Sequence, residues 1–155
     1  MTLSIALYQP DIAGNAGAIL RLGACLGIRV EIIEPAGFDM SDKALKRAGM
    51  DYVEMATLTR HPSFPQFEAE RRSAGRRTIL FTTAADRDYL SLEFCPDDIL
   101  LFGRESAGVP DGVHASADER VRIGMASGAR SLNLAVTAAM AAGEAIRQLR
   151  SRESS

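Results

Sequence analysis

The sequence has few of the residues that build disulfide frameworks, metal sites or membrane spans. It contains no tryptophan, two histidines and two cysteines. Cys25 and Cys95 lie far apart and neither has a C-x-x-C partner, so we expect free, buried thiols and no zinc site. No apolar run approaches the ~20 residues of a membrane helix, and Met1 is not followed by the basic start and long apolar stretch of a signal peptide. These absences predict a cytoplasmic protein without a metal.

An excess of positive charge is also missing. The formal net charge is −2, whereas nucleic-acid-binding proteins usually carry a basic excess. The basic residues are nonetheless unusual, because Lys43 and Lys46 are the only lysines among 18. The planar fork of arginine suits phosphate recognition, but arginine richness is also an ordinary compositional bias. Charge alone therefore leaves RNA binding open.

The order of apolar runs and turn residues predicts one α/β domain over residues 1–150, followed by a polar tail at 151–155. Asn15 is the expected N-cap of a helix that ends before Gly27. Because strands and helices alternate, we expect a mostly parallel sheet with helices on both faces. The expected strands are 4–8, 29–33, 52–55, 78–82, 99–102 and 120–123, and the later helices are 42–48, 64–73, 110–117 and 131–150.

The last of these helices, 131–150, is rich in small residues. An apolar stripe runs along it, formed by Leu132, Val136, Ala139, Ile146 and Leu149. Alanines and Gly143 extend around much of the remaining circumference, so this helix needs burial on more than one side. Two interpretations stay open, which are tight packing inside one chain and contact with a second copy.

The stretch from Ile99 to Pro110 is the centre of the predicted site. Four apolar residues end at Gly103, as a buried strand does when it delivers a loop to the carboxyl edge of a sheet. Glu105 argues against a phosphate loop, because a carboxylate repels phosphate, and neither common phosphate-loop fingerprint is present. Together with the loops at 81–83 and 124–131, this stretch could enclose one small molecule. Each loop taken alone is also compatible with an ordinary polar turn, and a flavin or nicotinamide ligand lacks its fingerprint.

A second group of residues lies on the first helix. Gly17 and Arg21 are one turn apart, so the missing side chain leaves room for a ligand beside the guanidinium. Asn15 stands at the amino terminus of the helix, where an anion is favoured. The same residues are equally compatible with a helix cap and a solvated charge.

Three segments of the chain carry a resemblance to a known family. They are Asn15-x-Gly-x-x-x-Arg21, the run Leu-Phe-Gly-Arg-Glu-Ser-x-Gly at 101–108, and Arg-Ile-x-Met at 122–125 with Arg-Ser-Leu-Asn-Leu at 130–134. In order and spacing they resemble the three motifs of the SPOUT class of methyltransferases. Within that class the chain is most similar to the minimal bacterial enzymes that methylate the ribose 2′-oxygen at the tRNA wobble position. Gly124 departs from the usual proline of the third motif.

The resemblance implies a deep trefoil knot at the carboxyl end, a homodimer and S-adenosylmethionine as cofactor. It also implies a tRNA substrate, bound through the anticodon stem-loop and methylated at a wobble cytidine or modified uridine. A ribosomal RNA methyltransferase of the same fold and a non-catalytic RNA-binding knot protein are the alternatives. The expected cofactor contacts are Phe81, Thr82, Gly103, Glu105, Ile123, Met125, Ser131 and Asn133.

The resemblance also assigns catalytic roles. It places Arg21 at the target ribose, and the motifs contain no histidine and no carboxylate pair to act as a base. We therefore expect Arg21 to orient the ribose and to stabilise the developing alkoxide, since ordinary arginine is too weak an acid to serve as a neutral base. Asn15 is expected to assist at the same site, and Glu105 suits a loop around a cationic sulfonium.

Overall fold

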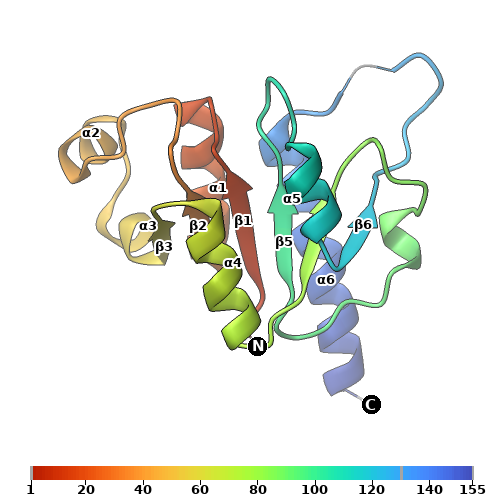
Figure 1. The fold of residues 1–155 in the computed structure, drawn as a ribbon. Coiled ribbons are helices and arrows are strands. Elements are labelled where there is room, and N and C mark those ends of the chain that lie inside the picture. The colour runs from red at the N-terminus through yellow and green to blue at the C-terminus, as the bar shows by residue number, and fades with distance from the viewer. Residues whose placement is uncertain (1, 130, 155) are drawn as a thin grey trace.

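A six-stranded sheet forms the centre of the computed structural model, which describes residues 2–129 and 131–154 (Figure 1). The strand order is β3-β2-β1-β5-β4-β6, and the five neighbouring pairs are all parallel. The strands are β1 (Ser4–Tyr8), β2 (Arg29–Ile33), β3 (Leu58–His61), β4 (Thr78–Phe81), β5 (Ile99–Phe102) and β6 (Glu119–Val121).

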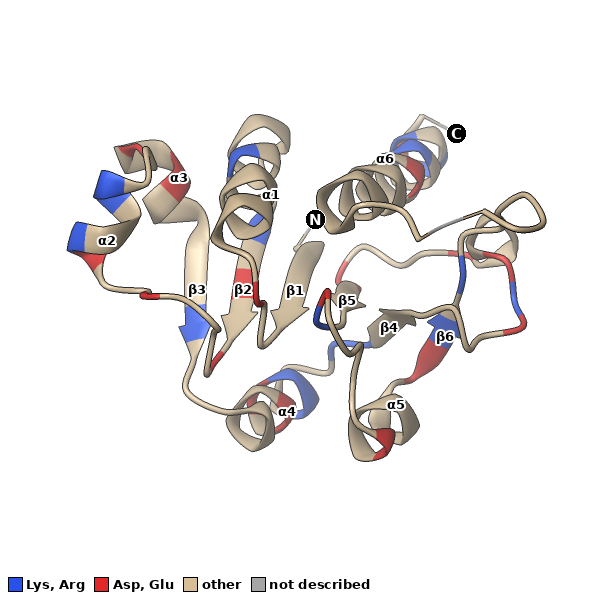
Figure 2. Ribbon diagram, turned by 90° about the horizontal axis from the view of Figure 1, so that it is seen from above, with Lys and Arg blue, Asp and Glu red and all other residues tan. Residues whose placement is uncertain are grey.

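Helices cover both faces of this sheet, as the view from above shows (Figure 2). One face carries α1 (Ala13–Leu26) and α6 (Leu134–Glu153), and the other carries α4 (Phe64–Ser73) and α5 (Asp111–Ser116). Two short helices, α2 (Asp42–Arg47) and α3 (Tyr52–Thr57), lie beside β3, and a 3-10 turn spans Tyr89–Ser91. This arrangement confirms the predicted α/β class, while the knot stays a prediction.

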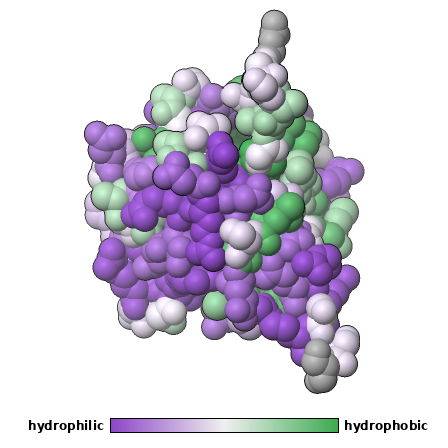
Figure 3. Space-filling view, turned by 90° about the vertical axis from the view of Figure 1, so that its right-hand side faces the viewer, coloured by the Kyte–Doolittle hydropathy of each residue, from purple (hydrophilic) through white to green (hydrophobic). Residues whose placement is uncertain are grey.

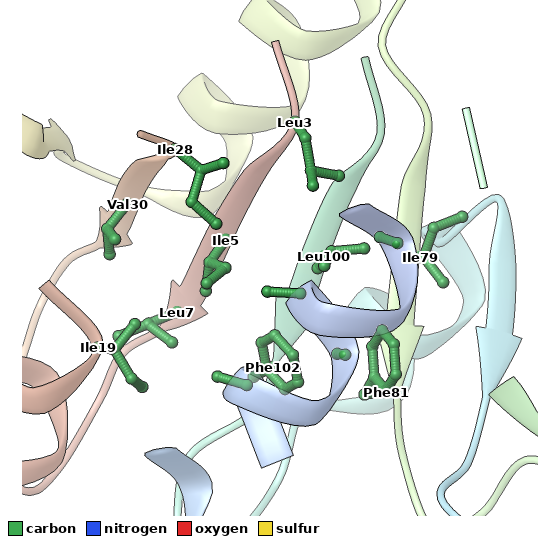
Figure 4. Packing of buried hydrophobic residues seen from close by; sticks show 14 of the residues in the cluster. Leu3, Ile5, Leu7, Ile19, Ile28, Val30, Ile79, Phe81, Leu100 and Phe102 are labelled. Atoms are coloured by element: carbon green, nitrogen blue, oxygen red, sulfur yellow. The ribbon is translucent and has the colours of Figure 1, made fainter. Parts of the chain in front are cut away.

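The core has two layers, because alternate residues of each strand point to opposite faces. On one side, Leu3, Ile5, Leu100 and Phe102 pack beneath α1 and α6 (Figure 4). On the other side, a smaller cluster that includes Ala6, Tyr8 and Leu101 packs around Phe67 of α4. The loops that follow β1, β4 and β5 begin at the carboxyl edge of this packed sheet.

Helix α6 differs from its prediction in both its ends and its buried face. It begins at Leu134, so Ser131 and Asn133 precede it, and it continues to Glu153 through most of the predicted polar tail. Its buried face is built mainly from alanines, at 138, 141, 142 and 145, and these let the helix approach the sheet closely. Of the predicted stripe, Ile146 and Leu149 are buried as expected, whereas Leu132 and Val136 are 40% and 47% exposed.

Three further predictions were wrong for identifiable reasons. Residues 52–55 form helix α3 and not a strand, because Asp51 and Glu54 make a capping box at its first turn. Asn15 is not an N-cap, since α1 already begins at Ala13. Cys25 and Cys95 are free, as expected, but exposed.

Within residues 2–129 and 131–154, no helix has the length and apolarity to span a membrane. In the same residues, no cluster of acidic, histidine or cysteine side chains could hold a metal ion.

Candidate active site

The candidate site lies where the chain changes direction in the sheet. From β1 the chain moves outward to β2, whereas from the neighbouring β5 it leads to β6 at the opposite edge. Loops that diverge in this way leave a crevice at the carboxyl edge, where open α/β sheets bind their ligands. A cavity of about 450 Å³ occupies this position. Asn15 lines it together with six residues of the predicted cofactor set, which are Phe81, Thr82, Gly103, Glu105, Ser131 and Asn133.

A smaller hollow of about 110 Å³ continues from the main cavity. The two share walls at Phe81, Thr82 and Ser131, and the smaller one adds Ile123 and Met125. The structure therefore brings all eight predicted cofactor residues to one connected space. The first and last of them, Phe81 and Asn133, are 52 residues apart in the sequence.

Gly103 serves the geometry of its own loop. A Cβ atom at this position would lie 2.6 Å from the carbonyl carbon of Gly108. The two backbones approach because the Arg104 and Gly108 amides exchange hydrogen bonds of 2.9 and 2.8 Å. Gly108 itself has a φ of +63°, a conformation that favours glycine. Both glycines are thus needed for the turn that forms one wall of the cavity.

Asp11, which the sequence analysis missed, anchors this loop to the segment after β1. Its carboxylate accepts hydrogen bonds from Nε of Arg104 at 2.9 Å, from the second guanidinium nitrogen, and from the Ser106 backbone at 3.1 Å and hydroxyl. The bonds from Ser106 and Arg104 lower the pKa of Asp11 to about 2. The carboxylate therefore stays ionised at any physiological pH.

Glu105 makes the reciprocal connection. One carboxylate oxygen accepts from the Asp11 amide at 3.1 Å, and the other accepts from the Ile12 amide at 3.1 Å and from Nδ2 of Asn15 at 3.3 Å. Glu105 thus holds the backbone of Asp11 and Ile12, the two residues that lead into α1, whose N-cap Ile12 provides no side-chain capping bond. Its charge thus stabilises the helix and loop that enclose the cavity.

Asn133 brings the third motif into the same network. Its Nδ2 donates to Oδ1 of Asn15 at 3.0 Å, while its Oδ1 accepts from the amides of Ala135 and Val136 at 2.8 and 3.3 Å. Asn133 is therefore the N-cap of α6. Through Asn15 it is linked to Glu105, so one chain of hydrogen bonds joins all three sequence motifs.

Arg21 lies apart from this network. It is six residues beyond Asn15, which is about 9 Å along the helix and on a different face. Its side chain is 64% exposed and borders a separate hollow of about 450 Å³ with Met50 and Glu54. The space beside Gly17 is partly filled, since a Cβ atom there would lie 3.3 Å from Cε of Met50. Within one chain, Arg21 and Asn15 do not meet at one site as expected.

Glu54 is the partner that fixes Arg21. Nε of Arg21 donates to Oε1 of Glu54 at 2.5 Å, and the Glu54 side chain is only 5% exposed. This hydrogen bond and the negative charge of Glu54 raise the pKa of Arg21 above its usual value. Sequence reasoning missed Glu54, although the spacing Asp51-x-x-Glu54 is the signal of a capping box.

A parallel sheet with a crevice bordered by these three motifs is the architecture of one group of RNA-modifying enzymes. Residues 2–143 match the model of the SpoU rRNA Methylase family, and the chain belongs to this family. It is 57% identical to the tRNA (cytidine(34)-2'-O)-methyltransferase of Beijerinckia indica over 145 residues, which cover 94% of this chain and 91% of that protein. It is 39% identical to the Escherichia coli K12 protein of the same name, over 95% of this chain and 94% of that one.

Solved structures agree with this assignment. One that describes the 2-OH methylation of C/U34 on tRNA superposes with a TM-score of 0.87 at 41% identity, covering 97% of both chains. A second is the SpoU methyltransferase AviRb from Streptomyces viridochromogenes in complex with the cofactor AdoMet. It superposes with a TM-score of 0.79 at 27% identity and covers 97% of this chain and 58% of that chain.

Proposed function

We propose that the protein transfers a methyl group from S-adenosylmethionine to the ribose 2′-hydroxyl of the tRNA wobble nucleotide, a cytidine or uridine in the anticodon loop. The observation that carries the proposal is the convergence of the eight predicted cofactor residues on one connected cavity. Relatives that carry the name of this reaction align over more than nine tenths of both chains. We place this activity in the cytoplasm, where tRNA is the abundant substrate.

The cavity suits the cofactor in size and chemistry. Its volume of about 450 Å³ falls within the ~300–1,000 Å³ typical of small-molecule sites. Phe81 and Phe102 are stacked, with ring centroids 5.0 Å apart, and give it an apolar wall, while Thr82, Ser131 and Thr137 offer hydroxyl groups. When bound, S-adenosylmethionine supplies a methyl group on a positively charged sulfur, so the protein's task is to align the acceptor hydroxyl.

Arg21 acts in this proposal as a cation and not as a base. Glu54 occupies its Nε, and in the described part of the chain no acceptor lies at its two terminal nitrogens. These nitrogens form a planar fork that can bind the ribose and a neighbouring phosphate. The raised pKa of Arg21 keeps it charged, which stabilises negative charge developing on the 2′-oxygen.

A homodimer would bring the separated parts together. Leu132, just before α6, and Val136 and Met140 in its first half are 40%, 47% and 38% exposed. The surface beside β6 is mostly hydrophilic, with apolar side chains gathered toward one side of it (Figure 3). We propose that a second copy covers the α6 residues and that its Arg21 completes the cavity, since Arg21 does not reach the cavity of its own chain.

The test is to incubate the protein with labelled S-adenosylmethionine and unmodified tRNA and to locate the label by mass spectrometry of nuclease fragments. We expect one methyl group on the ribose of nucleotide 34. A methylated base would contradict the proposal, and so would a preference for ribosomal RNA. RNA binding without any heat of cofactor binding in calorimetry would instead indicate a non-catalytic protein.

A further inference from the structure

The basic side chains of α2 are not engaged in ion pairs with any residue that the structure describes. Many arginines of the chain face a carboxylate, as Arg71, Arg77 and Arg147 do. Lys43, Lys46 and Arg47 of α2 make no ion pair within residues 2–129 and 131–154. Of the nearby acidic residues, Asp42 is paired with Arg60, and Asp39 accepts a hydrogen bond from the Ser41 amide. That bond, and to a smaller extent the positive charge of Arg47, lowers the pKa of Asp39, but the Asp39 and Arg47 side chains, both described by the structure, form no ion pair.

These three cations share one face of the helix. Positions 43, 46 and 47 are three and four residues apart, which places them together, whereas Leu45 between them is buried. Figure 2 shows basic residues on α2 at the outer edge of the molecule, next to α3. Because like charges at this spacing repel one another, the arrangement destabilises the free helix and favours a bound polyanion.

An exposed aromatic ring stands beside the cations. Tyr52, the first residue of α3, is 88% exposed, the highest value among the large apolar side chains described. It lies between Met50 and Glu54, which both border the hollow that contains Arg21. Ala48 and Gly49, directly after Arg47, border the same hollow. We take Tyr52 and the three cations as one surface, because residues 48–50 between them in the chain border the Arg21 hollow.

From this surface we infer that α2 and the start of α3 dock the single-stranded RNA next to the target nucleotide. Tyr52 stacks on an unpaired base, and Lys43, Lys46 and Arg47 bind the phosphates that follow it. Exposed rings interleaved with cations are the common means of holding unpaired RNA. This inference rests on the proposed function for the identity of the RNA, but the surface can be tested through binding alone.

The experiment titrates an anticodon stem-loop RNA against the full-length protein at several salt concentrations. Tyr52→Ala is expected to weaken binding at least about fivefold, while Tyr52→Phe keeps wild-type affinity because the stacking face is retained. Replacing Lys43, Lys46 and Arg47 together by alanine should reduce the slope of log K against log salt by about two. Arg72→Ala is the control, because it removes an exposed arginine from α4 on the opposite face of the sheet. It should change neither the RNA affinity nor the salt slope.

Two further measurements separate the surface from the active site. Cofactor affinity in calorimetry should be unchanged in every variant, and Tyr52→Ala should raise the KM for tRNA with little change in kcat. Wild-type RNA affinity and salt slope in both Tyr52→Ala and the triple variant would overturn the inference while leaving the methyl transfer intact. If the wild-type protein methylated no tRNA, the proposed function would fail, and the RNA titration would still decide the surface.

Discussion

Nε of Arg21 donates a hydrogen bond of 2.5 Å to Oε1 of Glu54, a carboxylate that is 5% exposed. Glu54 also caps α3, since its Oε2 accepts from the Asp51 amide at 3.3 Å. One buried side chain thus sets both the beginning of a helix and the direction of the guanidinium that we assign to the target ribose. The two roles can be separated by substitution.

Glu54→Gln is expected to lower kcat about tenfold with little loss of stability. Glutamine preserves the capping box, but it removes the negative charge that strengthens the bond to Arg21. The matched control is Asp51→Ala, which removes the capping bond to the Glu54 amide and should cost about 1 kcal/mol of folding stability. Its kcat should stay near the wild-type value at temperatures well below the unfolding transition. Thermal unfolding and single-turnover methylation measure the two effects, and equal kcat values for Glu54→Gln and wild type would contradict the assigned role.

Arg21→Lys should lose at least about a hundredfold in kcat, because lysine keeps the charge but not the planar fork. Because the pKa of Arg21 is raised above its usual value, its charge does not change near neutral pH. The pH profile of kcat should therefore show no transition in that range that comes from Arg21. Full turnover by Arg21→Lys in the methylation assay would remove the basis for its role.

Gly103→Ala is expected to abolish cofactor binding. The added Cβ atom would meet the backbone of Gly108 at 2.6 Å, so the loop must open. Gly112→Ala is the control, because nothing lies within 4 Å of a Cβ atom there and its φ is not positive. Calorimetry with S-adenosylmethionine distinguishes the two, and comparable affinities would show that the loop tolerates the clash.

Asp11 predicts how the cavity responds to acid. Its pKa is lowered to about 2, so the carboxylate contributes stability that is fully present above its ordinary value of 3.8 and is lost as the pH falls through about 2. Cofactor affinity should therefore show no loss from Asp11 between pH 5 and pH 8. Asp11→Asn should weaken cofactor binding across that whole range. A variant that binds as wild type does would show that Arg104 and Ser106 hold the loop without it.

Val136→Asp is expected to produce a monomer, because a charge at the centre of the apolar start of α6 opposes burial against a second copy. Leu90→Asp changes a leucine outside α6 that is 59% exposed, against 47% for Val136, and should leave the oligomeric state unchanged. Light scattering after size-exclusion chromatography reports the mass. A wild-type protein that elutes as a monomer would exclude the dimer directly.

Mixing two inactive variants tests whether Arg21 acts across the dimer. Arg21→Ala has an intact cavity, and Gly103→Ala has an intact Arg21, so a mixed dimer would contain one complete site. Refolding the two together in equal amounts should restore about a quarter of wild-type activity, since half of the dimers would be mixed. No recovery would place Arg21 at the site of its own chain.

Local sequence signals were sufficient for much of the fold. The strands at 4–8, 29–33 and 99–102 and the helix at 64–73 were predicted with their observed bounds, because short apolar runs and glycine stops fix them locally. Helix α3 was predicted as a strand at 52–55, because the capping box of Asp51 and Glu54 was not recognised. In the first half of α6 the buried side chains are alanines, whereas Val136 and Met140 are exposed, and this depends on how closely the helix approaches the sheet.

The candidate site was predicted in part for the same reason. Its eight cofactor residues follow from motifs and converge as expected, and those identities remain predictions until a ligand is bound. Asp11 and Glu54 escaped notice because their partners are distant in sequence, with Arg104 93 residues from Asp11 and Arg21 33 residues from Glu54. No periodicity or spacing within either segment reveals such a pairing.

The link between Asn133 and Asn15 spans 118 residues. During synthesis the amino-terminal half of the chain emerges first, yet its Asn15 lacks this partner until nearly the whole protein has been made. Ser131 and Asn133, which border the cavity, arrive equally late. A ribosome-bound chain that stops before them therefore cannot form the complete cavity, whose walls close only near the end of synthesis.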